Sequence, residues 1–225
     1  DRSPSRGLGD VYKRQVQHDA TMTAPAPQTR PDRVAWLRGI NVGGNKRVSM
    51  AQLRAVAVDL GWRQVSPHLN SGNLLFGAQG PASEVAAQLS EAIGERLGVE
   101  VAVLVREAAD LGALLAANPF PEGDPSRVCV AFVDSAVSTQ QWQRLEDLSA
   151  PPERLAYLPP DLVIDFANGL GQSGLAARLP VALRPAVVTV RNLRTVQAVA
   201  AKLGAAPSPE GPTSESVGQA VPRRG

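Results

Sequence analysis

Histidine and cysteine are scarce in this chain, and their scarcity argues against several kinds of chemistry. The 225 residues include two histidines, His18 and His68, and one cysteine, Cys129. Zinc sites of the Cys/His type and catalytic triads need more of these side chains, so we expect no metal site and no such triad. A single cysteine cannot form an internal disulfide, which favours a reducing, cytoplasmic location. Because Cys129 stands in an apolar run, we expect it to be a buried small hydrophobe.

Signals for cofactors, single-stranded RNA and membranes are also missing. There is no P-loop lysine motif, and the glycines at 39–44 have the wrong spacing for a dinucleotide fingerprint, so we expect no cofactor. The three Trp, two Tyr and four Phe are scattered and form no evident stacking platform for bases. No apolar run is long enough to cross a bilayer, so we expect no membrane partner. A net charge of +2 gives only weak support for nucleic acid as a partner.

The two ends of the chain differ from its middle. Residues 1–32 are expected to be a disordered or non-native leader. Residues 6–15 resemble the translation of an adapter-like nucleotide sequence at the head of an open reading frame, and Met22 fits a natural start. A genuine basic tail is the alternative. Residues 205–225 are rich in Pro, Ser, Gly and Glu without hydrophobic periodicity, which predicts a disordered tail.

The pattern of residues 33–105 predicts a ferredoxin-like unit. Ser49 and Gln52 form a capping box ahead of a helical apolar stripe, and Asn70–Asn73 is turn chemistry for a hairpin. The expected elements are a strand at 33–38, a helix at 50–60, strands at 64–69 and 74–76, a helix at 81–97 and a strand at 99–105. This order, β-α-β-β-α-β, is that of the ferredoxin-like motif.

The same order returns in residues 125–204, after a connecting helix and loop at 106–124. The expected elements are a strand at 128–133, a helix capped by Ser138, strands at 154–158 and 162–166, a short helix from Ser173, a strand at 186–190 and a helix capped by Asn192. The fold class is therefore α/β (α+β), with tandem ferredoxin-like repeats. The repeat is one of element order, and we find no residue-by-residue similarity between the halves.

Unusual residues gather at one sheet edge of the first repeat. The loop after the first strand and the turn between the second and third strands should meet there. Glycine-rich backbone and a following helix N-terminus favour anions. The side chains and glycines brought together are Arg38, Asn41, Gly43, Gly44, Asn45, Lys46, Ser71 and Asn73.

A second cluster is expected in the second repeat, where the loop after its third strand should meet the end of its fourth. Its members are Asn168, Gly169, Gly171, Gln172, Ser173, Arg191 and Asn192. Each cluster thus contains glycine, a helix N-terminus and an arginine. Arginine can grip a phosphate or carboxylate through two parallel hydrogen bonds.

Each of these features also has a purely structural interpretation. The glycines at 43–44 suit a tight strand-to-helix connection, and Asn70–Asn73 suits an ordinary hairpin turn. Ser173 and Asn192 are N-caps first and ligand contacts second. For Arg38 and Arg191, an ion pair with a nearby carboxylate is an alternative to a ligand contact.

Five motifs resemble a known family. They are Leu-Arg-Gly-Ile-Asn-Val-Gly-Gly at 37–44, Ser-Gly-Asn at 71–73, Asn-Pro-Phe at 118–120, Gly-Leu-Gly-Gln-Ser at 169–173 and Thr-Val-Arg-Asn at 189–192. Together they resemble the domain-of-unknown-function family 1697 over residues 33–204. The resemblance implies an α/β protein of two ferredoxin-like repeats, mostly bacterial, and implies no activity. The chain departs from the family at Leu193, Arg194 and Gly174, where the family tends to have Trp, Asn and Lys.

Three functional hypotheses remain open from the sequence. The first is a binding protein that holds a phosphorylated small molecule or a nucleic-acid phosphate at the arginine-glycine edges. The second is a metal-independent enzyme in which Arg38 and Arg191 stabilise developing negative charge. The third is a structural or assembly protein. The sequence does not indicate an oligomeric state.

Overall fold

The computed structural model describes residues 30–41 and 48–205. Most of the expected leader and nearly all of the expected tail lie outside these ranges. The first repeat consists of β1 (Arg33–Leu37), α1 (Met50–Asp59), β2 (Arg63–Pro67), β3 (Asn73–Gly77), α2 (Ala82–Leu97) and β4 (Val103–Glu107). Its four strands form an antiparallel sheet in the order β2-β3-β1-β4.

The second repeat has the same topology. It consists of β5 (Val128–Val133), α4 (Thr139–Leu148), β6 (Arg154–Leu158), β7 (Asp161–Asp165), the 3-10 turn η1 (Leu170–Gln172), α5 (Gly174–Ala182) and β8 (Val188–Asn192). Its sheet order is β6-β7-β5-β8, again antiparallel. One further helix follows each repeat, α3 (Ala108–Ala116) after β4 and α6 (Leu193–Leu203) after β8. The predicted fold class of two tandem ferredoxin-like repeats is confirmed.

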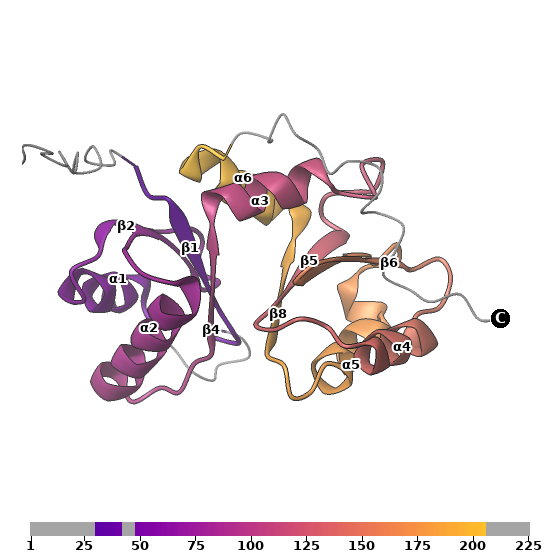
Figure 1. The fold of residues 1–225 in the computed structure, drawn as a ribbon, viewed down its shortest axis with the longest axis horizontal. Coiled ribbons are helices and arrows are strands. Elements are labelled where there is room, and N and C mark those ends of the chain that lie inside the picture. The colour runs from indigo at the N-terminus through magenta and orange to yellow at the C-terminus, as the bar shows by residue number, and fades with distance from the viewer. Residues whose placement is uncertain (1–29, 42–47, 206–225) are drawn as a thin grey trace, which may run out of the picture.

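The two sheets turn their inner faces toward each other, with helices on their outer faces (Figure 1). Helices α1 and α2 cover the first sheet, and α4 and α5 cover the second. Helices α3 and α6 lie together across the top of the space between the sheets, as Figure 1 shows. The chain therefore has three hydrophobic layers, of which the middle one belongs to both repeats.

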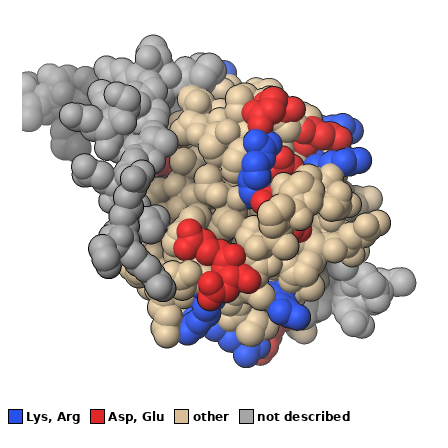
Figure 2. Space-filling view, turned by 90° about the vertical axis from the view of Figure 1, so that its right-hand side faces the viewer, with Lys and Arg blue, Asp and Glu red and all other residues tan. Residues whose placement is uncertain are grey.

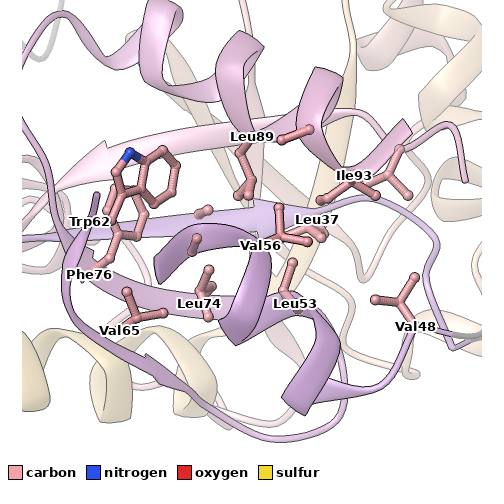
Figure 3. Packing of buried hydrophobic residues seen from close by; sticks show 14 of the residues in the cluster. Leu37, Val48, Leu53, Val56, Trp62, Val65, Leu74, Phe76, Leu89 and Ile93 are labelled. Carbon is pink, nitrogen blue, oxygen red and sulfur yellow. The ribbon is translucent and has the colours of Figure 1, made fainter. Parts of the chain in front are cut away.

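Strand β1 is buried on both faces, which explains its unbroken apolar run. Ala35 and Leu37 point into the outer core under α1 and α2, whereas Val34 and Trp36 point into the middle layer. Figure 3 shows this outer core, where Trp62 stacks on Phe76 with ring centroids 4.1 Å apart. A strand with apolar side chains on both faces has the pattern expected of a central strand.

The middle layer is formed by the inner faces of both sheets and by α3 and α6. At its centre Trp36 of the first repeat stacks on Phe132 of the second, with ring centroids 4.7 Å apart and planes 14° apart. Leu111 of α3 and Val196 of α6 are fully buried in the same layer. The two repeats thus share one hydrophobic interior.

The expected helix caps are confirmed. Ser49 and Ser138 each accept a hydrogen bond from the backbone of the third helical residue, Gln52 and Gln141, whose side chains bond back. Two strands, however, run farther than expected. Strands β4 and β8 continue to Glu107 and Asn192, beyond the predicted ends at 105 and 190, so each includes an arginine inside the sheet.

Strand pairing places the two repeats in a common register, which the order of elements alone does not provide. In the central strands, Val34 and Val130 occupy the same place. Opposite them on the last strands stand Arg106 and Arg191. The equivalent segments are Val-Ala-Trp-Leu at 34–37 with Val-Ala-Phe-Val at 130–133, and Val-Leu-Val-Arg at 103–106 with Val-Thr-Val-Arg at 188–191. Such short matches stand out only after the strands are placed in register.

No helix among the described residues combines the length and apolar character needed to cross a bilayer.

Candidate functional site

The end of β1 and the turn before β3 meet, as the sequence predicted. The Leu37 N–H donates to the Gly72 carbonyl at 2.8 Å. The Asn41 side chain donates to the Asn70 carbonyl at 3.1 Å and to the Val48 carbonyl at 2.9 Å. Asn41 therefore joins Val48, which lies just ahead of α1, to the hairpin turn.

Gly72 is required by this close approach. Its φ of +74° is favourable for glycine, and a Cβ there would lie 2.9 Å from the Ile40 side chain and 3.0 Å from the Leu37 Cβ. Any larger residue would push the turn away from the end of β1. The Ser-Gly-Asn motif thus has a structural reason for its glycine.

The Asn73 side chain makes hydrogen bonds to the turn and to the second repeat. Its side chain is fully buried, and its Nδ2 donates to the His68 carbonyl at 3.0 Å and to Ser71 Oγ at 3.1 Å. Its Oδ1 accepts a hydrogen bond from Nε of Arg191 at 2.6 Å. Asn73 therefore joins the turn of the first repeat to the last strand of the second.

The Arg191 guanidinium crosses from β8 into the first repeat. Its Nη2 donates to the carbonyls of Leu37 at 2.8 Å and Ser71 at 3.1 Å. Its Nη1 donates to Thr189 Oγ1 at 2.8 Å and to the Val190 carbonyl at 2.9 Å. These acceptors are neutral, and burial lowers the pKa of Arg191 to about 10. Among the described residues no carboxylate forms an ion pair with it.

Arg106 makes the equivalent crossing in the opposite direction. Its guanidinium forms a bidentate ion pair with Asp161 of β7, with Nε–Oδ2 and Nη2–Oδ1 distances of 2.9 and 2.5 Å. Its Nη2 also donates to the Val133 carbonyl at 2.6 Å. The side chains of Arg106 and Asp161 are 12% and 5% exposed. Each arginine also lies over the other repeat's central ring, Arg106 over Phe132 and Arg191 over Trp36.

Arg106 and Arg191 each reach into the other repeat, and these two contacts, called crossings below, differ in one hydrogen-bond partner. Asn73 begins β3 and Asp161 begins β7, at equivalent places in the two sheets. Arg106 therefore meets a carboxylate where Arg191 meets a carboxamide. A buried charge is normally paired or neutralised, because leaving water costs an ion far more than a neutral group. The end of β1 and the turn before β3, where the sequence predicted an anion, are called the anion edge below. Only the arginine at this edge, Arg191, has a charge that no described carboxylate balances.

The predicted second cluster is not assembled around Arg191. Ser173 is the N-cap of α5, which covers the outer face of the second sheet, whereas Arg191 points from the inner face toward the first repeat. Successive side chains of a strand alternate between the two faces of the sheet, so two residues near the same sheet edge can point to opposite faces. Ser173 and Asn192 instead act as N-caps, accepting from the backbone N–H of Ala176 and Thr195.

The other predicted residues have different places. Arg38 and Ser71 are exposed at the anion edge, and no described residue forms a hydrogen bond or ion pair with the Arg38 guanidinium. Gly43, Gly44, Asn45 and Lys46 lie outside the described residues. Sequence reasoning missed Arg106 and its pairing with Asp161; the repeated Val-X-Val-Arg of β4 and β8 marks Arg106 and Arg191 as equivalent once the strands are in register.

A family comparison matches residues 31–160 of the chain to the family described as "Protein of unknown function (DUF1697)". The match covers more than half of the chain. The chain belongs to this family. The suspected resemblance is confirmed, and the DUF1697 description assigns no activity.

Among solved structures, this DUF1697 protein is similar to the conserved bacterial protein SP0830 from Streptococcus pneumoniae. The TM-score is 0.65 at 22% sequence identity, and the match covers 77% of this chain and 98% of the other. At this identity the likeness concerns the fold alone. A comparison with curated proteins finds no match.

Proposed function

We propose that the anion edge of the first repeat binds a phosphate-bearing ligand. The anion edge is the surface formed by Arg38, Asn41 and Ser71, with the buried Asn73 bonded to Ser71 Oγ. The observation that carries the proposal is the buried charge of Arg191 directly behind this surface, which no carboxylate among the described residues balances. A bound anion would supply the negative charge that Asp161 supplies to Arg106.

The two arginines have different parts in this proposal. The N–H groups of Arg191 already have protein acceptors, so Arg191 attracts the ligand through its field rather than through direct contact. Arg38 is exposed and follows Leu37, whose carbonyl accepts from Arg191. Its guanidinium supplies the bidentate contact with phosphate oxygens.

A small phosphorylated molecule fits this surface better than a nucleic acid. Nucleic-acid binding needs a broad basic surface, because affinity comes from many phosphate contacts. Figure 2 shows the other side of the molecule, where the second repeat lies, and there basic and acidic side chains lie among one another. The net charge of the whole chain is only +2.

The first experiment measures binding of pyrophosphate, nucleotides and sugar phosphates to the full chain by thermal shift and calorimetry. A ligand specific to the folded state raises the melting temperature. We expect Arg38→Ala to weaken binding at least about tenfold, the loss of one charge-assisted contact. Arg63→Ala is the matched control, because Arg63 is also exposed but lies at the far end of the sheet, opposite Gly77. Equal binding by both variants would contradict the proposed site.

A second experiment tests the charge of Arg191 without removing it. Asn73→Asp places a carboxylate beside Arg191, as Asp161 stands beside Arg106, and should weaken anion binding although position 73 is buried. Asp161→Asn, the reverse change at the other crossing, should leave anion binding unchanged. If Asn73→Asp folds and binds the anion as well as wild type does, the field of Arg191 has no part in binding.

A further inference from the structure

Strand β4 is an edge of the first sheet, and several of its outer backbone groups have no hydrogen-bond partner among the described residues. Ala102 accepts from the Arg38 N–H and Ala108 donates to the Asp32 carbonyl, so residues 102, 104, 106 and 108 bond toward β1. Val103 and Val105 therefore direct their N–H and C=O groups away from β1. Of these four groups, only the Val105 carbonyl has a hydrogen-bond partner among the described residues. It accepts from Nη1 of Arg106 at 2.9 Å.

A groove of about 590 Å³ runs along this open edge. One wall is the N-terminal half of α2, where Ala82, Ala86 and Ala87 present small side chains. The opposite wall comes from the second repeat, through Asp134 and Val187. A strand added to a sheet lies 4.7–4.9 Å from its neighbour, and small residues leave that space free.

We propose that this groove binds an extended peptide segment of a protein partner, which joins the first sheet as a strand beside β4. The open N–H and C=O of Val103 and the open N–H of Val105 supply the main-chain hydrogen bonds. Such strand addition takes its affinity from the backbone and its specificity from pockets for alternate side chains. The alanines of α2 accept side chains of the size of Ala, Val or Thr.

The charge in the groove defines one further feature of the partner. Asp134 is exposed and has no basic partner among the described residues, and its Oδ1 is held by the Val187 N–H at 2.9 Å. The other charged lining residue, Arg106, is neutralised by Asp161. The groove therefore presents one fixed negative charge, and the segment carries Lys or Arg beside Asp134.

The test uses synthetic peptides of about eight residues, alternating Val and Thr, with Lys or Glu at either end. Fluorescence anisotropy with the full chain should show binding of a Lys peptide and at least about fivefold weaker binding of its Glu twin. Amide exchange should slow at Val103 and Val105 when the Lys peptide is bound. Asp134→Asn keeps the acceptor for Val187 and should remove the preference for Lys.

Two variants separate strand addition from other kinds of contact. Val103→Pro removes an outward N–H that takes no part in the ladder, a position where an edge strand tolerates proline, and should abolish binding. Ala87→Arg fills the groove and should do the same, whereas Gln88→Arg, the next exposed position of α2 and outside the groove, should not.

Three results would overturn the proposal. The first is binding of the Lys and Glu peptides with equal affinity or of neither. The second is binding unchanged in folded Val103→Pro and Ala87→Arg. The third is self-association of the wild-type chain that Val103→Pro removes, since this would make a second copy the occupant.

Discussion

Arg106 and Arg191 stand at equivalent positions on the last strands of the two repeats, and each reaches into the other repeat. Arg106 bonds to Asp161 and to the Val133 carbonyl, and Arg191 bonds to Asn73 and to the Leu37 carbonyl. The contacts are reciprocal about the Trp36–Phe132 stack, as at an interface with two-fold symmetry. The middle layer is thus arranged like the interface of a homodimer, although a single chain forms both halves.

The buried pair of Arg106 and Asp161 should matter far more for stability than a surface pair. Arg106→Met leaves the Asp161 carboxylate buried without its cation, and we expect the free energy of unfolding to fall by about 3–5 kcal/mol. Arg96→Ala breaks the exposed pair with Asp59 and should cost less than about 1 kcal/mol. Urea denaturation measures both. Similar losses in the two variants would show that the buried pair contributes no more than the surface one.

Replacing Arg191 should be less damaging than replacing Arg106. Arg191→Met removes a desolvated charge and leaves only neutral acceptors, at Asn73 and at the carbonyls of Leu37 and Ser71. We expect a loss of about 1–3 kcal/mol in the same urea measurement. A loss larger than that of Arg106→Met would mean that Arg191 is compensated by a charge outside the described residues.

The thiol of Cys129 should be unreactive in the native protein. Cys129 is 4% exposed on β5, as predicted from its apolar run, and burial raises its pKa to about 12. Ellman's reagent at pH 8 should label it only after unfolding in urea. Above about pH 8.5 the unfolded chain loses a proton that the native chain keeps, so the free energy of unfolding falls. Cys129→Ala should show a flatter alkaline slope, and an equal slope would contradict the shifted pKa.

His68 should titrate at lower pH than an ordinary histidine. Burial, and then the charge of Lys202, lower the pKa of His68, whose Nδ1 lies 3.0 Å from the Lys202 ammonium. The native chain resists the proton that the unfolded chain takes up, so this group makes stability fall as pH drops through about 6.5. Lys202→Gln should raise the pKa, measured from the ring proton in NMR. An unchanged pKa would mean that burial alone lowers it.

The sequence predicted the fold well because local signals agreed with one another. The capping boxes of Ser49 and Ser138, the turn at Asn70–Asn73 and the two-sided apolar run of β1 each specify local structure. Their order was enough to predict two ferredoxin-like units. Strand ends were less certain, because Arg106 and Arg191 look like solvent-facing residues until the second repeat is packed against the first.

The candidate site was predicted only in part. Proximity of Asn41 to the hairpin turn follows from topology, and it is confirmed. The direction of the Arg191 side chain depends on which face of its sheet is covered by α5 and which by the other repeat, and no local pattern specifies that. The pairing of Arg106 with Asp161 is likewise a contact between repeats, and the sequence offered no sign of how the repeats pack.

The reciprocal crossings have a consequence for how this architecture can change. In a homodimer of identical halves, every substitution at the interface occurs twice, so both ends carry the same chemistry. Covalent connection of the halves removes that constraint. One end holds an ion pair between Arg106 and Asp161, and the other holds Arg191 and Asn73 without a carboxylate among the described residues. A tandem chain can thus place different chemistry at the two ends of one interface.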